Sequence, residues 1–281
     1  MNKLQQTQFE ILKEFIGICQ ALDLQYFLVC GSALGSVKYG GFIPWDDDID
    51  VALPREDYEI FLKNAQTLLP QYYFLQNYKT DKYYHHFCSK IRDSRTTYVE
   101  YDQKNLNIHH GVFIDIIPLD VLPNDTNFMV KYRFFRVCQL IYLKSREKYK
   151  NIIKSVLRPF VNIRIVHMCF EKYLQNNMAT DRVQYCNFHN AKNNRLYMKE
   201  EIYGKGTTAK FEGIEVVVPE KYDEYLTAYY GSWRTELPPD EQVGHHYYEI
   251  MDLEHPYTDY IMKTTRHGRF IKISKTPVVN W

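Results

Sequence analysis

Apolar residues recur along the N-terminal part of the chain with two different periods. A spacing of three to four residues predicts amphipathic helices, and short apolar runs that end at glycine or proline predict buried strands. The elements predicted in this way are a helix over 4–22, a strand over 26–30, a short helix over 33–39, a strand over 49–53 and a helix over 55–69. Further strands are predicted over 72–76, 84–92, 97–101 and 111–117.

From about residue 127 the pattern changes to long helical stretches that continue to residue 176. The elements that follow residue 195 are a strand over 211–219, a helix over 220–231 and a proline-bearing loop over 232–246. We therefore predict an α/β (α+β) fold, in which helices flank a mixed sheet. The predicted parts are a core over 1–126, a basic helical insertion over 127–195 and a C-terminal part over 196–281 that completes the core domain.

The helical insertion carries an excess of positive charge in a chain that is nearly neutral as a whole. The 281 residues have a formal net charge of +1, and the apolar fraction of 45% excludes a disordered chain. Residues 131–164 contain ten Lys or Arg and one acid, Glu147, which gives +9 locally and leaves the rest near −8. This basic stretch either forms a solvated helical subdomain or makes peripheral contact with an anionic membrane. Nucleic acid is not an expected partner, because no recognition motif accompanies the charge.

Two features of the sequence indicate the cellular compartment of the protein: six scattered cysteines and a polar N-terminal stretch. The cysteines form no C-x-x-C pair, which is typical of free thiols in a reducing compartment rather than of disulfides or a zinc site. The N-terminal stretch lacks the apolar core of a signal peptide, and no apolar run reaches the ~18 residues of a membrane span. We therefore expect a cytoplasmic protein, peripheral at most at the inner face of the membrane.

Four acids stand together in the stretch WDDDID, directly before the second predicted strand. If residues 48–52 are extended, Asp48 and Asp50 share one face of the strand, roughly 6.6 Å apart, and Asp46 continues the alternation. Carboxylates at this spacing can converge on one divalent cation or on a pair of cations. Without a cation, the cluster would repel itself beside buried apolar groups.

A further acid, Asp115, interrupts the apolar run GVFIDII. An ionised carboxylate in a buried strand needs a counter-charge or a metal. If this strand lies beside 49–53, Asp115 completes a three-carboxylate site, whose hard oxygen ligands select Mg²⁺, Mn²⁺ or Ca²⁺. A solvated acidic turn stays open as an alternative. So does an EF-hand calcium loop, which would need Gly and Glu where Val51 and Asp57 stand.

Gly31 and Ser32 stand between a predicted strand and a predicted helix. Backbone N–H groups at such a helix start suit a phosphate, glycine permits close approach, and the serine hydroxyl adds a donor. An ordinary turn gives the same local pattern. Because the acidic cluster follows closely, the combination favours phosphoryl chemistry.

The stretch GSALGSVKYGGFIPWDDDIDVALPREDY (31–58) resembles the signature of the LicD family, the bacterial phosphocholine transferases, to which the fukutin-type ribitol-phosphate transferases are related. The resemblance continues through KIRDSRTTYVE, HHGVFIDIIPLDVLP and FEGIEVVVPEKYDEYLTAYYGSWRTELPP. It implies a nucleotidyltransferase-like catalytic core. It also implies Mg²⁺-dependent transfer of a phosphorylated alcohol from a CDP-alcohol to a glycan hydroxyl, with release of CMP.

The resemblance also implies roles for individual residues. The metal ligands for Mg²⁺, or Mn²⁺ in its place, fall on Asp46, Asp48, Asp50 and Asp115, and the last three are the catalytic candidates. Lys38 stands where many members carry Arg and joins Gly31 and Ser32 as a phosphate-binding candidate. The acceptor is expected to be a cell-surface glycan or its lipid-linked precursor, and the alcohol is expected to be choline.

Several other residues are candidates for substrate contacts. Lys90 and Arg92 share one face of the strand predicted over 84–92 and are expected to meet the donor diphosphate, unless that face is a solvated edge. Of the paired histidines, His245 or His246 is the best candidate, and we select His245. Tyrosines predicted near the acids, such as Tyr98, either hold a quaternary ammonium group or pack the sheet.

Two other functions remain open at this point. The same glycine, serine and aspartates serve a nucleotidyltransferase that transfers NMP from a nucleoside triphosphate to a small acceptor and releases pyrophosphate. They also serve a non-catalytic module that binds a metal or a nucleotide.

Overall fold

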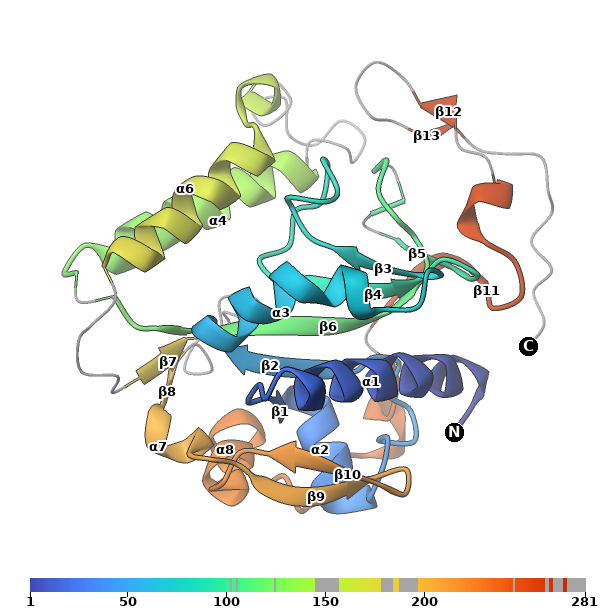
Figure 1. Cartoon of the computed structure of the whole chain (residues 1–281), viewed down its shortest axis with the longest axis vertical. Coiled ribbons are helices and arrows are strands. Elements are labelled where there is room, and N and C mark those ends of the chain that lie inside the picture. The colour runs from blue at the N-terminus through green and yellow to red at the C-terminus, as the bar shows by residue number, and fades with distance from the viewer. Residues whose placement is uncertain are drawn as a thin grey trace.

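A mixed β-sheet forms the centre of the molecule (Figure 1). The computed structural model describes residues 1–101, 103–104, 106–123, 125–144, 157–177, 184–186, 197–244, 246–260, 263–264 and 270–271. The candidate His245 and residues 145–156 of the basic stretch lie outside the described residues.

Five strands follow one another across the sheet in the order β1–β2–β6–β4–β3. Their bounds are β1 Phe27–Leu28, β2 Asp50–Pro54, β3 Tyr73–Gln76, β4 Ser89–Asp93 and β6 Val112–Val121. β2 and β6 run parallel and the other neighbours are antiparallel, so the sheet is mixed as predicted. Every residue of β2, β4 and β6 is buried. Each isoleucine of β6 therefore contributes about 2 kcal/mol of hydrophobic stabilisation.

Two helices, α1 (Lys3–Ala21) and α3 (Arg55–Leu68), pack on β6 and on each other (Figure 1). α1 begins with a capping box, in which the side chains of Asn2 and Gln5 each bind the other's backbone N–H. Such a cap stabilises a helix by about 1 kcal/mol. α3 follows β2 directly and carries Glu56 and Asp57 in its first turn, where negative charge is favourable.

The C-terminal part of the chain returns to the first strands. β9 (Thr207–Phe211) and β10 (Ile214–Val218) form a hairpin, and α8 (Tyr222–Tyr230) follows it. β9 and α8 pack on α2 (Cys30–Tyr39), and β10 packs on β1. The single strand predicted over 211–219 is wrong, because Glu212 and Gly213, both with positive φ, form a turn between two strands.

The two helices α4 (Phe128–Lys144) and α6 (Ile163–Asn176) lie side by side next to the sheet (Figure 1), and the short η1 (Arg158–Phe160) precedes α6. Arg55 of α3 ties α6 to the core, since its guanidinium donates to Asp120 of β6 and pairs with Glu171 of α6. β7 (Gln184–Cys186), β8 (Tyr197–Lys199) and α7 (Glu200–Tyr203) come next. Among the described residues, no helix has the length and apolar character that a membrane crossing requires. The division of the chain into three parts stays a prediction.

A separate ribbon pairs β5 (Thr97–Glu100) with β11 (Tyr248–Asp252). The remaining short elements are η3 (Pro239–Glu241), η4 (Tyr257–Tyr260), β12 (Lys263–Thr264) and β13 (Phe270–Ile271). Two predicted strand bounds differ from the structure. The strand expected over 84–92 begins only at Ser89, after a turn in which Tyr84 donates its backbone N–H to Asp81. β6 continues to Val121, because β7 pairs with its last two residues.

Candidate active site

β2 and β6 bring three carboxylates together. The strands pair with Asp50 opposite Asp115, and Asp48 lies two residues before β2 begins. One oxygen from each of these three side chains lies within 4.8 Å of the others, a spacing that suits a shared divalent cation. The structure thus joins the acids that the sequence analysis placed side by side. One detail differs, since Asp46 and Asp48 stand in a loop before β2 rather than in an extended strand.

Buried polar side chains hold this acidic loop. From α1, Gln5 donates to the carbonyl of Asp46 at 3.0 Å and Gln8 donates to the carbonyl of Asp47 at 2.8 Å. The sequence analysis missed both glutamines, because a polar residue in an amphipathic helix carries no sign that it is buried. Ser32 accepts the backbone N–H of Asp50 at 2.9 Å and does not line the cavity. Its hydroxyl therefore positions β2, rather than facing a phosphate as predicted.

The acids raise one another's pKa values. Burial, and then the negative charges of neighbouring aspartates, raises the pKa of Asp46 to about 9 and that of Asp50 well above its ordinary value. Burial also raises the pKa of Asp48, although His246 opposes the shift. A bound cation would relieve this repulsion, and an all-carboxylate donor set is the kind that Mg²⁺ or Mn²⁺ prefers. The residues present therefore fit the predicted metal.

Lys90 and Arg92 of β4 lie on the face of the sheet that also carries Asp115 of β6, but they are buried. The Nζ of Lys90 lies 3.0 Å from Asp115 and 3.8 Å from Glu100. Arg92 donates to Glu100, to the side chain of Gln76 and to a backbone carbonyl. Neither cation belongs to the cavity lining, so the structure gives no support to the predicted contacts with the diphosphate, and the alternative of a solvated edge is wrong because both side chains are buried. Their positive charges instead balance internal carboxylates.

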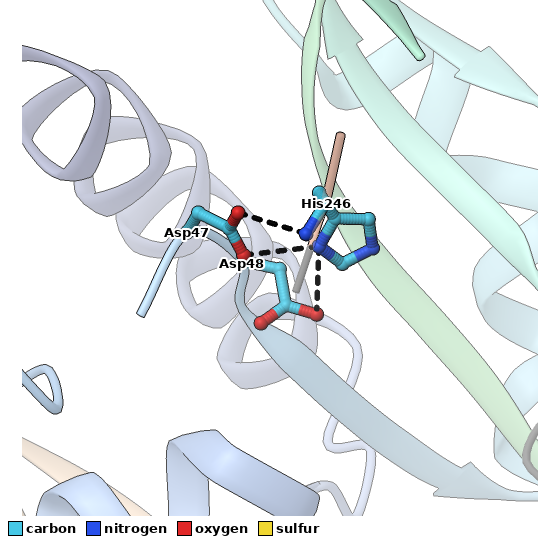
Figure 2. A group of neighbouring side chains, drawn as sticks. All are labelled: Asp47, Asp48 and His246. Atoms are coloured by element: carbon cyan, nitrogen blue, oxygen red, sulfur yellow. Dashed lines mark hydrogen bonds and ion pairs between the residues drawn. The ribbon is translucent and has the colours of Figure 1, made fainter. Parts of the chain in front are cut away.

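A histidine from the C-terminal part faces the acids (Figure 2). The backbone N–H and ring Nδ1 of His246 bind the two carboxylate oxygens of Asp47, at 2.9 and 3.1 Å, and Nδ1 lies 3.8 Å from Asp48. Burial alone would lower the pKa of His246, but the bond to Asp47 and the charge of Asp48 outweigh it and raise this pKa to about 10. His246 is therefore the histidine that the described residues place at the site, and the selected His245 lies outside the described residues.

A cavity of about 650 Å³ opens over the acids. Its lining joins the acidic loop and β6 to α2 and to the segment after α8, through Cys30, Gly31, Leu34, Lys38, Tyr39, Ile43, Trp45, Asp46, Asp48, Asp50, Asp115, Tyr229, Tyr230, Ser232, Trp233, Thr235, Glu236, Leu237 and His246. Tyr98, considered above for an ammonium group, is buried and does not belong to this lining.

Gly31 is required by the close approach of the acidic loop. A Cβ atom at this position would lie 2.7 Å from an Oδ of Asp46, closer than such atoms normally come. The preceding Cys30 has φ of 51°, and its backbone N–H donates to the hydroxyl of Tyr225 from α8. A left-handed conformation at a non-glycine residue costs on the order of 1 kcal/mol, which the packing of α8 offsets.

The region that carries these acids matches a known family. Residues 23–170 match the family model described as the nucleotidyltransferase domain of LicD/FKTN/FKRP. The chain belongs to this family. The matched region contains every acid of the cluster, whereas the C-terminal wall of the cavity lies beyond it.

Relatives of this LicD-family chain include named transferases. Over 280 residues it is 26% identical to the lipopolysaccharide cholinephosphotransferase LicD of Haemophilus influenzae. This alignment covers 89% of this chain and 97% of that protein. Over 48 residues it is 38% identical to the human ribitol 5-phosphate transferase FKRP, covering 17% of this chain and 10% of that one. It is also 26% identical over 106 residues to an uncharacterised protein of Rickettsia prowazekii, covering 38% of each.

Proposed function

We propose that this LicD-family protein transfers phosphocholine from CDP-choline to a hydroxyl of a cell-surface glycan or its lipid-linked precursor, releasing CMP. The observation that carries the proposal is the meeting of Asp48, Asp50 and Asp115 on the wall of a cavity of about 650 Å³. Pockets of this size hold ligands as large as a nucleotide. The similarity to a cholinephosphotransferase along nearly the whole chain supports the same reaction class.

Asp48, Asp50 and Asp115 would hold Mg²⁺ or Mn²⁺, with Asp46 beside them. A bound divalent cation supplies neutralisation of the charge that develops on the leaving phosphate. Lys90 restrains Asp115 from the buried side, and His246 borders Asp48 from the C-terminal part. These two cations limit the mutual repulsion of the carboxylates and keep them in place for ligand binding.

Gly31 and Lys38 support binding of the donor diphosphate. Gly31 lines the cavity in the first turn of α2, where backbone N–H groups have no partner within the helix. Lys38 also lines the cavity, pairs with Glu236 at 3.2 Å and donates to the carbonyl of Trp233. Its ammonium group thus anchors the segment after α8 and adds positive charge beside the donor.

Asp46 is our choice of proton acceptor for the attacking hydroxyl. Asp46 and Asp115 both line the cavity, but the carboxylate of Asp115 already receives bonds from Lys90 and Cys88. The acceptor oxygen attacks the phosphorus that carries the alcohol and forms a phosphodiester bond. The bond from this phosphorus to the bridging oxygen breaks, and CMP leaves with that oxygen.

The aromatic lining supports choline as the alcohol. The rings that line the cavity beside a carboxylate, Glu236, are those of Tyr39, Trp45, Tyr229, Tyr230 and Trp233. Tyr39 and Trp45 meet edge to face with centroids 6.3 Å apart, and the hydroxyl of Tyr39 donates to Glu236 at 2.7 Å. Aromatic faces suit a quaternary ammonium group, each ring contributing roughly 0.5–2 kcal/mol.

The test compares CDP-choline, CDP-ethanolamine, CDP-glycerol and CDP-ribitol with Mg²⁺ and a glycan acceptor, with CMP release as the readout. We expect CDP-choline to give the highest kcat/KM. We also expect Trp45→Leu to lower this value for CDP-choline more than for CDP-glycerol, unlike the control Tyr72→Leu at an exposed position. A polyol used ten times more efficiently than choline would contradict the choline assignment alone. Pyrophosphate release from a nucleoside triphosphate, without CMP release, would contradict the whole proposal.

A further inference from the structure

The helices α4 and α6 and the short η1 expose several large apolar side chains. On α4, Val130, Phe134 and Val137 follow one another at helical spacing and are 68%, 62% and 51% exposed. Phe160 of η1 is 83% exposed. Ile165 and Met168 of α6 continue the set, and we name these six residues the outer face.

The outer face is not part of the core. Each helix has a second apolar side that is buried, with Tyr132 and Cys138 on α4 and Phe170 and Leu174 on α6. Phe170 and Leu174 belong to a hydrophobic cluster that also contains Phe128, so α4 and α6 bury these apolar sides against each other. Folding of this pair therefore leaves the outer face without a function in the described fold, and exposed apolar patches of this kind mark interaction sites.

The charged residues of α4, η1 and α6 are basic with one exception. The basic residues of α4, η1 and α6 are Lys131, Arg133, Arg136, Lys144, Arg158, Arg164 and Lys172. Glu171 is the single acid in these elements, and its carboxylate turns to Arg55 and Lys79. Arg133 and Arg164 are exposed and directly precede Phe134 and Ile165 in the sequence. Lys131 pairs at 2.6 Å with Asp125, which precedes α4, whereas the described residues of α4, η1 and α6 themselves include no exposed acid.

We propose that the outer face docks on the anionic surface of a lipid bilayer. Exposed aromatic and aliphatic side chains enter the boundary between headgroups and acyl chains, and the neighbouring arginines bind lipid phosphates. Both kinds of residue are needed, because one basic or one apolar contribution alone gives only weak, reversible binding. A nucleic acid would leave the apolar side chains without a partner, so the combination favours a bilayer.

Flotation of the full-length protein with vesicles tests this surface. We expect flotation with vesicles containing phosphatidylglycerol at low salt, on the order of tenfold less at high salt because charges are screened, and little with phosphatidylcholine alone. Phe134→Gln, Val137→Gln and Phe160→Gln combined should lower flotation at least tenfold. The control combines Ile60→Gln, Leu68→Gln and Val243→Gln, which change other exposed apolar residues elsewhere and should float like the wild type.

A second pair of variants tests the charges. Arg133→Gln with Arg164→Gln should reduce both flotation and its salt dependence, whereas Lys63→Gln with Lys205→Gln should change neither. Circular dichroism checks that each variant is folded, and CMP release with a soluble acceptor should stay as in the wild type. Flotation of the apolar triple variant at the wild-type level would overturn the proposal. A second contradicting result would be a wild type that does not float with vesicles and is a dimer by light scattering, while the apolar triple variant is a monomer.

Discussion

At the residue scale, the site depends on close approaches that tolerate little change. Gly31 meets Asp46, and Gly244 meets Asp47, with added Cβ atoms 2.7 Å from a carboxylate oxygen in both cases. Small residues here let the acidic loop lie between α2 and the C-terminal segment. These glycines therefore help to determine the position of the carboxylates in the site.

Gly31→Ala should displace Asp46 and lower the rate of CMP release, because the new methyl group and the carboxylate cannot share the space. The matched control is Gly17→Ala in α1, where nothing lies within 4 Å of the added atom. That control should keep full activity and gain up to about 1 kcal/mol in unfolding free energy, because alanine favours a helix. Equal activity of the two variants, measured at saturating donor, would contradict the role given to Gly31.

At the element scale, β4 and β5 are joined by a buried ionic network behind the site. Glu100 of β5 pairs with Lys90 and Arg92 of β4, and Lys90 continues to Asp115 of β6. Burial alone would raise the pKa of Glu100, but the two cations outweigh it and lower this pKa to about 2. The network thus links a strand outside the main sheet to the central acid.

Glu100→Gln should destabilise the protein by roughly 3–5 kcal/mol, because it leaves the buried Arg92 without its counter-charge, whereas Lys90 keeps its ion pair with Asp115. The pKa of Glu100 is lowered on folding, so its contribution is present above pH 4.5 and is lost as pH falls towards 2. Urea unfolding at pH 7 and at decreasing pH measures both effects, with exposed Glu224→Gln as the control. A variant that is as stable as the wild type at pH 7 would contradict this assignment.

The elements differ in how well the sequence predicts them. The acids of β2 and β6 were predictable as a site, because ionised carboxylates inside apolar strand patterns need a counter-charge or a metal. The burial of Lys90 and Arg92 was not predictable, since alternation assigns a face of β4 but not the Glu100 that comes from β5 to cover it. The turn at Glu212-Gly213 did carry a signal, because a glycine between two apolar runs is typical of a hairpin.

At the scale of the whole molecule, the site is assembled from segments far apart in the sequence. The family match over 23–170 contains the acids, but Tyr230 and His246 line the same cavity from beyond it. Sequence alone could not place the C-terminal wall, because the pairing of β5 with β11 brings His246 to the acids. The basic helices α4 and α6 add a separate surface, which combines exposed apolar side chains with basic residues.

The central claim is that the acidic cluster drives metal-dependent transfer, and CMP release by Asp48→Asn and Asp50→Asn tests it most directly. With Mg²⁺ and the best donor, each variant should lose at least ~10³-fold in kcat, because stabilisation of the transition-state charge rests on the bound cation. Both should stay folded, since replacing one acid relieves repulsion within the cluster. The wild type should lose activity in chelator and regain it with Mg²⁺, and the surface control Asp240→Asn should behave like the wild type. Activity within tenfold of the wild type in both variants would contradict the account.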